Sequence, residues 1–320
     1  MKGAFYNENY HKITVQNCRA SLCSGVLPVK PCNEILCVGF WADLRAPVPA
    51  VCRGRHDCSI QRGHRANSQY CFFCGRADKG IRFKKPQDYV SELRYLSSIQ
   101  TTKYIFEIGD DFLQDYCWIS EVADLLSKNP IRDDVHLKIF SRANRITPDV
   151  IPILKKLNID EVAIGFESGS EKILNNINKK ASPEDNMNAA KLMFENGIDT
   201  IASFVLGLPG EDEVSLQETY VQAIKIRELA LKHLGKIPQE IIANMIEINP
   251  GAPAFKKLCN HYSKKYACKD DLDVYETQND YFKMEFNLKN DFELTSFRQR
   301  LVYWGNKINQ LGSYTYLSMI

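Results

Sequence analysis

The fold is decided by residues 161–210, EVAIGFESGSEKILNNINKKASPEDNMNAAKLMFENGIDTIASFVLGLPG. A β-rich run at Glu161–Gly165 is followed by a helical pattern at Pro183–Glu195 and by a second β-rich run at Thr200–Leu206. This order of strand, helix and strand is typical of a βα unit around a parallel sheet.

The same alternation extends from about residue 86 to about residue 250. It predicts helices at Pro86–Ser98, Trp118–Ser127, Pro148–Leu157, Pro183–Glu195 and Glu213–Leu231. It predicts strands at Tyr104–Ile108, Val135–Phe140, Glu161–Gly165, Thr200–Leu206 and Ile241–Ile248. Thr147-Pro148 and Ser182-Pro183 each place a capping side chain before a proline at the first helical position, and Gly197 follows a helix end.

One more strand is expected before the first helix, at Val48–Arg53 or at Ser59–Gly63. About six strands predict an α/β fold, a partial (β/α)6 TIM-like barrel. We expect a cysteine-rich N-terminal extension over 1–45, the barrel over 46–255 and a C-terminal extension over 256–320 that ends in a helix near Glu293–Gln310.

Composition excludes several classes of protein. Of the 320 residues, 44% are hydrophobic and 25% are charged, and the net charge is +2, as in average soluble globular proteins. Nothing resembles a cleavable leader or a membrane span of about 20 apolar residues. We therefore expect a cytoplasmic protein with no membrane association.

Two cysteines share a loop ahead of the first helix, in Cys71-Phe72-Phe73-Cys74. Eleven cysteines are many for a protein of a reducing compartment, where metal or redox roles are commoner than disulfides. Two thiolates at this spacing can bind a metal centre, with zinc and a redox pair as rivals. A third thiolate would complete the ligand set that leaves one iron of a [4Fe-4S] cluster open to S-adenosylmethionine.

Short motifs follow the ends of the expected strands, where βα loops build active sites. They are Gly109-Asp110-Asp111, Ser141-Arg142-Ala143, Gly165-Phe166-Glu167-Ser168-Gly169 and Leu206-Gly207-Leu208-Pro209-Gly210.

Together with the Cys-x-aromatic-Cys loop and Gly75-Arg76, these motifs resemble the radical S-adenosylmethionine superfamily, in particular its methylthiotransferase-like and cobalamin-dependent branches. The resemblance covers about residues 50–255. It implies an enzyme with a [4Fe-4S] cluster and S-adenosylmethionine as cofactors. The reduced cluster cleaves S-adenosylmethionine to a 5'-deoxyadenosyl radical, which removes hydrogen from a substrate. A reductant protein such as flavodoxin or ferredoxin supplies the electron.

The resemblance also implies which residues contact S-adenosylmethionine. Glu167 can accept both ribose hydroxyls, and Arg142 can bind the carboxylate unless it pairs at the surface with Asp149 or Glu161. The full set is Phe73, Gly109, Asp110, Asp111, Arg142, Glu167, Ser168 and Leu208.

The cluster ligands are Cys71, Cys74 and a third residue that departs from the family pattern, because His64 follows Arg62-Gly63 where a cysteine is usual. We select Cys58, since a thiolate suits iron better than imidazole, and His64 and Cys52 remain alternatives.

Other features narrow the function. About 50 residues precede the loop region, too few for a cobalamin domain, and the termini lack the basic patch of a tRNA binder. We expect a small-molecule or peptide substrate and no nucleic-acid partner. Cys18, Cys23, Cys32 and Cys37 are either an auxiliary cluster site or buried apolar residues. Two alternatives are a non-catalytic homologue and a zinc protein that uses Cys58, His64, Cys71 and Cys74.

Overall fold

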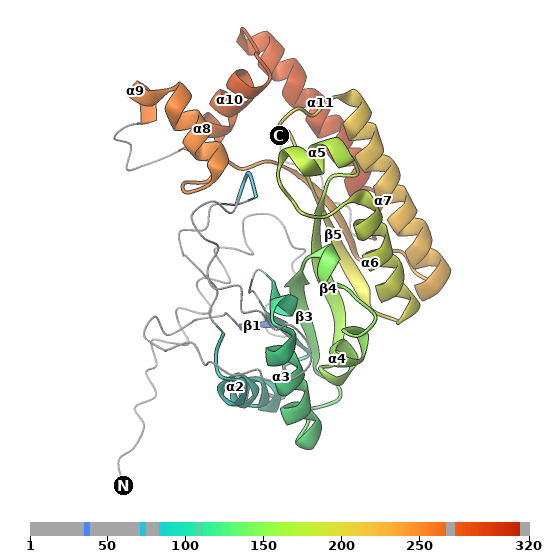
Figure 1. Ribbon diagram of the computed structural model, residues 1–320. Helices are drawn as coiled ribbons and strands as arrows, with labels where there is room; N and C mark the ends of the chain where they lie inside the picture. The colour runs from blue at the N-terminus through green and yellow to red at the C-terminus, as the bar shows by residue number, and fades with distance from the viewer. Residues whose placement is uncertain are drawn as a thin grey trace. The chain divides into compact units, whose positions relative to one another are not determined.

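The computed structural model describes residues 35–38, 71–74, 83–107, 109, 111–266 and 273–313. Six strands follow one another in chain order in one sheet, with helices between successive strands (Figure 1). The strands are β1 (Ile35–Val38), β2 (Tyr104–Glu107), β3 (His136–Ser141), β4 (Ile159–Glu167), β5 (Asp199–Leu206) and β6 (Glu240–Met245). The sheet does not close on itself, so the predicted α/β class and partial barrel are confirmed.

The chain divides into two compact units. Of the described residues, the first holds 35–38, 83–107, 109, 111–141 and 147–163, and the second holds 71–74, 142–146, 164–266 and 273–313.

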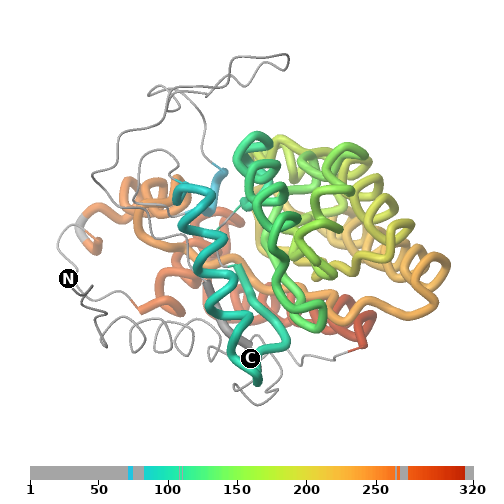
Figure 2. Tube along the Cα trace, turned by 90° about the horizontal axis from the view of Figure 1, so that it is seen from below, coloured from blue at the N-terminus to red at the C-terminus, as the bar shows by residue number. Residues whose placement is uncertain are grey.

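In the first unit, β1, β2 and β3 are parallel neighbours, with Ile35 opposite Tyr104 and Tyr104 opposite His136. Helices α2 (Pro86–Ser98) and α3 (Tyr116–Lys128) lie side by side (Figure 2), and α4 (Ile151–Lys156) packs against α3. A short turn of 3-10 helix, η1 (Phe112–Gln114), precedes α3. The core of this unit is apolar, and each fully buried side chain of this kind stabilises it by about 1.5–3 kcal/mol. Its members include Leu93, Ile105, Ile119, Leu137, Ile139 and Leu154.

In the second unit, β5 and β6 are parallel, with Ile201 opposite Glu240 and Leu206 opposite Met245. Helices α6 (Pro183–Glu195) and α7 (Glu213–Leu234) pack together. The remaining helices are η2 (Ala143–Arg145), α5 (Glu171–Asn176), α8 (Pro253–His261), α9 (Ser263–Tyr266), α10 (Val274–Glu285) and α11 (Asp291–Asn309).

The free edge of β6 is covered by the end of α11. The Ala243 N–H donates to Asn309 Oδ1 at 2.6 Å, and the Ser313 N–H donates to Pro238 O at 3.0 Å. A Cβ on Gly312 would come within 2.8 Å of Ile241 N, so only glycine allows this close approach. An open sheet thus gains partners for an edge that would otherwise expose unpaired backbone groups.

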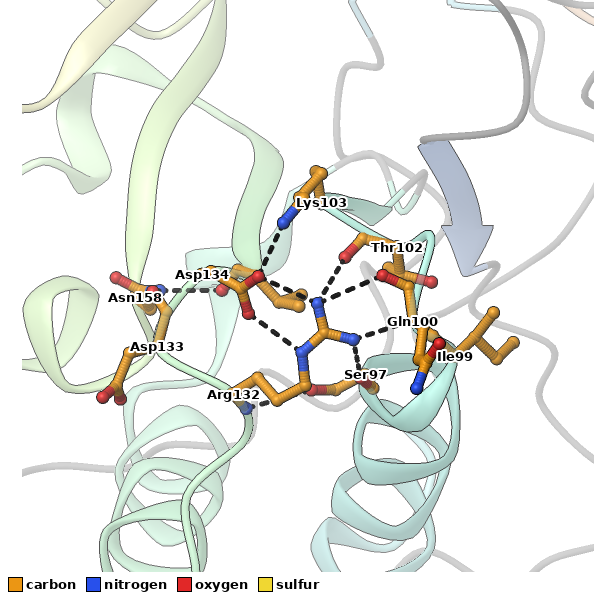
Figure 3. A network of polar contacts seen from close by, with 10 residues as sticks. Ser97, Ile99, Gln100, Thr102, Lys103, Arg132, Asp133, Asp134 and Asn158 are labelled. Atoms are coloured by element: carbon orange, nitrogen blue, oxygen red, sulfur yellow. Dashed lines mark hydrogen bonds and ion pairs between the residues drawn. The ribbon is translucent and has the colours of Figure 1, made fainter.

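The amino ends of β2 and β3 are joined by Arg132, whose guanidinium reaches both a helix end and a carboxylate (Figure 3). It donates to Ser97 O at 3.0 Å and to Ile99 O at 2.9 Å, carbonyls at the end of α2. It also donates to Asp134 Oδ1 at 2.9 Å, and Lys103 Nζ lies 2.6 Å from Asp134 Oδ2. Arg132 therefore caps α2 and joins the loops that lead into β2 and β3.

Several predicted boundaries are confirmed and some are wrong. The helices Pro86–Ser98 and Pro183–Glu195 have the predicted bounds, and Ser182 forms a capping box with Asp185. The helix expected at Pro148–Leu157 begins only at Ile151, because the Val150 N–H donates to Thr147 O and closes a turn before it.

Differences also occur at the ends of the chain. Strand β1 lies within the segment assigned as an N-terminal extension, while the two expected positions of the first strand, Val48–Arg53 and Ser59–Gly63, lie outside the described residues. The C-terminal extension, predicted over 256–320, holds the end of α8 and all of α9 to α11 where one helix was expected. No helix in the described part of the chain is long and apolar enough to cross a membrane.

Candidate functional site

The cysteine pair of the second unit occupies a tight turn. The Cys74 N–H donates to Cys71 O at 3.1 Å, and both cysteines are free and half-buried. The turn is clamped through Phe72, whose N–H donates to Ile177 O at 3.0 Å and whose carbonyl accepts from the Ala254 N–H at 2.9 Å. The predicted metal loop is thus held by the segments that follow α5 and begin α8.

Glu167 ends β4 with a left-handed backbone, φ +63°. A non-glycine residue adopts this region only at a cost, so such residues often mark functional sites. Its carboxylate pairs with Lys179 at 2.6 Å, and the two side chains are only 9% and 11% exposed. A Cβ on Gly165 would lie 2.2 Å from Glu167 Oε1, so glycine makes room for the carboxylate.

Cys71 shares an electrostatic environment with this ion pair. Burial raises the pKa of the Cys71 thiol, the charge of Lys179 opposes that rise, and Glu167 adds to it. Lys179 was not predicted from the sequence, because Asn178-Lys179-Lys180 has the composition of an ordinary surface loop.

Ser168, predicted to face S-adenosylmethionine, is fully buried in a polar network. Its hydroxyl hydrogen-bonds with that of Thr219 at 3.0 Å and accepts from the Ser170 N–H at 3.1 Å. A Cβ on Gly169 would meet the backbone of α7 at 2.4 Å. These contacts pin the segment after β4 to α7, and contact of Ser168 with the cofactor stays a prediction.

The turn after β5 is similarly fixed. Gly207 has φ +83°, and a Cβ there would lie 2.6 Å from the Phe282 ring. Its N–H donates to Glu211 Oε2, and its carbonyl accepts from Tyr281 Oη at 3.2 Å. Glu211 is buried, which raises its pKa to about 8. Leu208, predicted beside the adenine, is fully buried within this turn.

The first unit carries the predicted acidic segment after β2. The Gly109 N–H donates to Glu107 Oε1 at 3.0 Å, and Ser141 Oγ donates to Asp111 Oδ1 at 3.2 Å. Burial raises the pKa of Glu107 to about 8, and hydrogen bonds from Tyr89 and Gly109 oppose that rise. Glu107 was missed from the sequence, although an acid that ends an apolar strand is a signal of a buried carboxyl group.

Other predicted site residues are placed only in part. Arg142 is exposed ahead of η2, and Phe73 lies in the cysteine turn. Cys52, Cys58, His64, Gly75, Arg76 and Asp110 lie outside the described residues. Among the residues that the structure does describe, no three metal-ligating side chains come together. The choice of first cluster ligand therefore stays open.

Comparisons with known proteins bear on this arrangement. Residues 65–223 match the model of the Radical SAM superfamily. The anaerobic magnesium-protoporphyrin IX monomethyl ester cyclase of Rubrivivax gelatinosus is 35% identical over 157 residues, which are 48% of this chain and 28% of the relative. The threonylcarbamoyladenosine tRNA methylthiotransferase of Bacillus subtilis is 24% identical over 207 residues, 60% of this chain and 44% of the relative.

Among solved structures, OxsB, a cobalamin-dependent S-adenosylmethionine radical enzyme, superposes with a TM-score of 0.51 at 16% identity. The match covers 74% of this chain and 44% of OxsB, and it shows a shared fold. The chain spans less than half the length of each of these three proteins.

Proposed function

Residues 65–223 belong to the radical SAM superfamily, and on that premise we propose that the chain binds one [4Fe-4S] cluster and S-adenosylmethionine and removes a hydrogen atom from a substrate. When bound, the reduced cluster supplies the electron that splits the sulfonium into methionine and a 5'-deoxyadenosyl radical. The protein binds and orients the reactants and excludes water.

One observation carries this proposal: the cysteine turn, Glu167 and Lys179 share one environment in the second unit. Cys71 and Cys74 are free thiols in a half-buried turn, and thiolates are the usual ligands of iron–sulfur clusters. Lys179 adds a positive charge that offsets the negative charge of thiolate ligands. The described residues therefore fit two of the three ligand positions, with Cys58, His64 or Cys52 as the third.

The Glu167–Lys179 pair suits the polar groups of S-adenosylmethionine. A carboxylate in this position can accept hydrogen bonds from the ribose hydroxyls, and a largely buried ammonium can bind the carboxylate of the methionyl part. Lys179 would then remain paired with a carboxylate and Glu167 would remain hydrogen-bonded, so neither buried charge would lack a polar partner.

The other sites remain part of the proposal as the sequence predicted them. Gly109, Asp110 and Asp111 are assigned to the amino group, and Arg142 is assigned, together with Lys179, to the carboxylate. Phe73, Ser168 and Leu208 complete the contacts to the cofactor by packing or through backbone.

The substrate is proposed to be a small molecule or a peptide, and the electron donor a protein such as flavodoxin or ferredoxin. The names of the two curated relatives point to a magnesium porphyrin and to a modified tRNA. Because the chain spans less than half of either relative, neither substrate is carried over.

The test is anaerobic reconstitution with iron and sulfide, followed by metal analysis and by chromatographic assay of 5'-deoxyadenosine from S-adenosylmethionine and dithionite. We expect about four irons per chain and formation of deoxyadenosine. Cys71→Ala should lose both, while Cys117→Ala, which removes a half-buried cysteine of α3, serves as the matched control.

Cys58→Ala, His64→Ala and Cys52→Ala then identify the third ligand, since only one of them should lose iron as Cys71→Ala does. Zinc without iron would support the zinc protein in place of the enzyme. A protein that binds neither iron nor zinc and forms no deoxyadenosine would support the non-catalytic homologue.

A further inference from the structure

Strand β3 leaves one of its faces partly open. Leu137 and Ile139 are fully buried, whereas the alternate residues Lys138 and Phe140 are not, and Phe140 is 37% exposed. Strands of parallel sheets are normally covered on both faces. The part of this face of β3 that carries Phe140 is therefore open to a ligand.

The exposed ring is supported by a second one. Phe140 stacks on Phe106 of the neighbouring strand with ring centroids 5.0 Å apart and planes inclined by 26°, and Phe106 itself is buried. Phe106 and Phe140 are each the penultimate residue of their strand, β2 and β3. They lie at the carboxyl ends, where βα folds bind their ligands.

Two residues earlier along β3, the same face becomes polar. Lys138 Nζ lies 2.6 Å from Glu161 Oε1 and 4.9 Å from the centre of the Tyr104 ring. The ion pair is largely buried, and such a pair adds little to stability because desolvation offsets its attraction. At about 3.3 Å per residue, it lies about 7 Å deeper than Phe140.

We propose that Phe140, backed by Phe106, is the platform on which the substrate lies, and that the substrate carries a planar aromatic or conjugated ring with a polar group at its edge. This inference rests on the proposed function and narrows its substrate class. A flat π-system can stack against the exposed Phe face, whereas the hydrogens of a saturated ring hold it away. A polar edge directed at Lys138 and Glu161 gives the ion pair a partner where an apolar edge would only desolvate it.

Exposure alone does not mark such a platform, as another exposed phenylalanine shows. Phe292 is 81% exposed, but it lies in the first turn of α11. Single exposed apolar residues of this kind are normal on protein surfaces. Phe292 therefore provides a matched control for Phe140.

The test measures binding directly with two probes of equal carbon count, naphthalene-2-carboxylate and decahydronaphthalene-2-carboxylate, by calorimetric titration of the reconstituted 320-residue chain. The wild type should bind the flat probe about 2- to 13-fold more tightly, the ratio expected from an aromatic contact of about 0.5–1.5 kcal/mol. Phe140→Leu should abolish the preference, Phe140→Tyr should keep it, and Phe292→Leu should leave it unchanged. Thermal unfolding checks that each variant is folded.

Equal affinity of the wild type for both probes, absence of binding to either, or a preference that survives Phe140→Leu would each overturn the platform. The titration contains no S-adenosylmethionine, and the deoxyadenosine assay contains no ring probe. The proposed function and the substrate platform are therefore tested independently. A protein that forms deoxyadenosine but does not prefer the flat probe keeps the proposed function and loses the platform. A protein with the preference but without iron loses the proposed function.

Discussion

The two ends of strands β2 and β3 use acidic side chains in opposite ways. At the amino end, the exposed Asp134 accepts hydrogen bonds from Arg132 and Lys103, which hold its pKa far below the ordinary value. At the carboxyl end, Glu107 is fully buried, and burial raises its pKa to about 8. One carboxylate is charged and shared between cations, while the other is mostly neutral at pH 7.

This difference separates stability from function. In βα barrels, the loops at the carboxyl ends of the strands build the sites, and the opposite end contributes stability. The second unit also has energetically unfavourable features at the carboxyl ends of its strands. Glu167 has a left-handed backbone at the end of β4, and Glu211 is a buried carboxyl group in the turn after β5. We therefore expect substitutions at the carboxyl ends to affect chemistry first, and those at the amino end to affect folding first.

The largest effect is expected at Glu167. Glu167→Gln keeps the size of the side chain but removes the charge that pairs with Lys179. A hydrogen bond to a charged group contributes about 1.5–3 kcal/mol, so kcat/KM for deoxyadenosine formation should fall by about 10- to 100-fold. The rate is measured over a range of S-adenosylmethionine concentrations.

The matched control is the exposed pair Lys172–Asp212, whose side chains are 56% and 51% exposed. Lys172→Gln should change kcat/KM by less than about twofold, because exposed pairs contribute little. If Glu167→Gln behaved like Lys172→Gln, the carboxyl end of β4 would not be part of the site.

The sequence predicted the elements of the fold better than their ends. The bounds of α2 and α6 were predicted correctly, because each helix begins with a proline and α6 also has a capping box, and these signals are local. Hydrophobic periodicity missed β1, which is short and lies far upstream of the helix that follows it. Pairing of such a strand depends on a distant partner, Tyr104–Glu107, and not on its own pattern.

Site residues could be predicted where they belong to a sequence motif. They could not be predicted where only their contacts or their burial in the folded chain distinguish them. Cys71, Cys74 and Glu167 stand in recognisable motifs. Lys179 could not be found in this way, since its importance comes from a contact with Glu167 twelve residues away. Glu107 is equally inconspicuous, because only burial distinguishes it from a surface acid.

The next effect concerns pH and Glu107. The carboxyl group titrates near 4.5 in the unfolded chain and near 8 in the folded protein, so unfolding between these values releases a proton. The contribution of Glu107 to stability is therefore full below pH 4.5 and is lost as the pH rises toward 8, by about 1.4 kcal/mol per pH unit. Glu107→Gln, which cannot ionise, should remove this slope. Its stability relative to the wild type should therefore be greater at pH 8 than at pH 5.

The measurement is urea unfolding followed by circular dichroism at a series of pH values. Glu228→Gln, at an exposed position of α7, is the control and should keep the wild-type slope. An unchanged slope in Glu107→Gln would mean that Glu107 is already ionised at neutral pH, and the contrast between the two strand ends would disappear.

A smaller effect is expected at Arg132. Arg132→Lys keeps the positive charge beside Asp134 but cannot also reach the carbonyls of Ser97 and Ile99. The midpoint of thermal unfolding should fall by roughly 5 °C, as expected when hydrogen bonds to helix-terminal carbonyls are lost. Deoxyadenosine formation per folded molecule should not change, and a large loss of activity without loss of stability would contradict the division between the two ends.

The smallest effect is expected at Lys103, which shares Asp134 with Arg132 and is 46% exposed. Lys103→Ala should lower the unfolding midpoint by less than about 2 °C, and the shift should disappear in about 0.5 M salt, because water and ions screen exposed charges. The loss in Arg132→Lys should persist in the same salt, because it comes from missing hydrogen bonds. Equal and equally salt-sensitive losses in the two variants would show that charge, and not the capping of α2, stabilises the amino end.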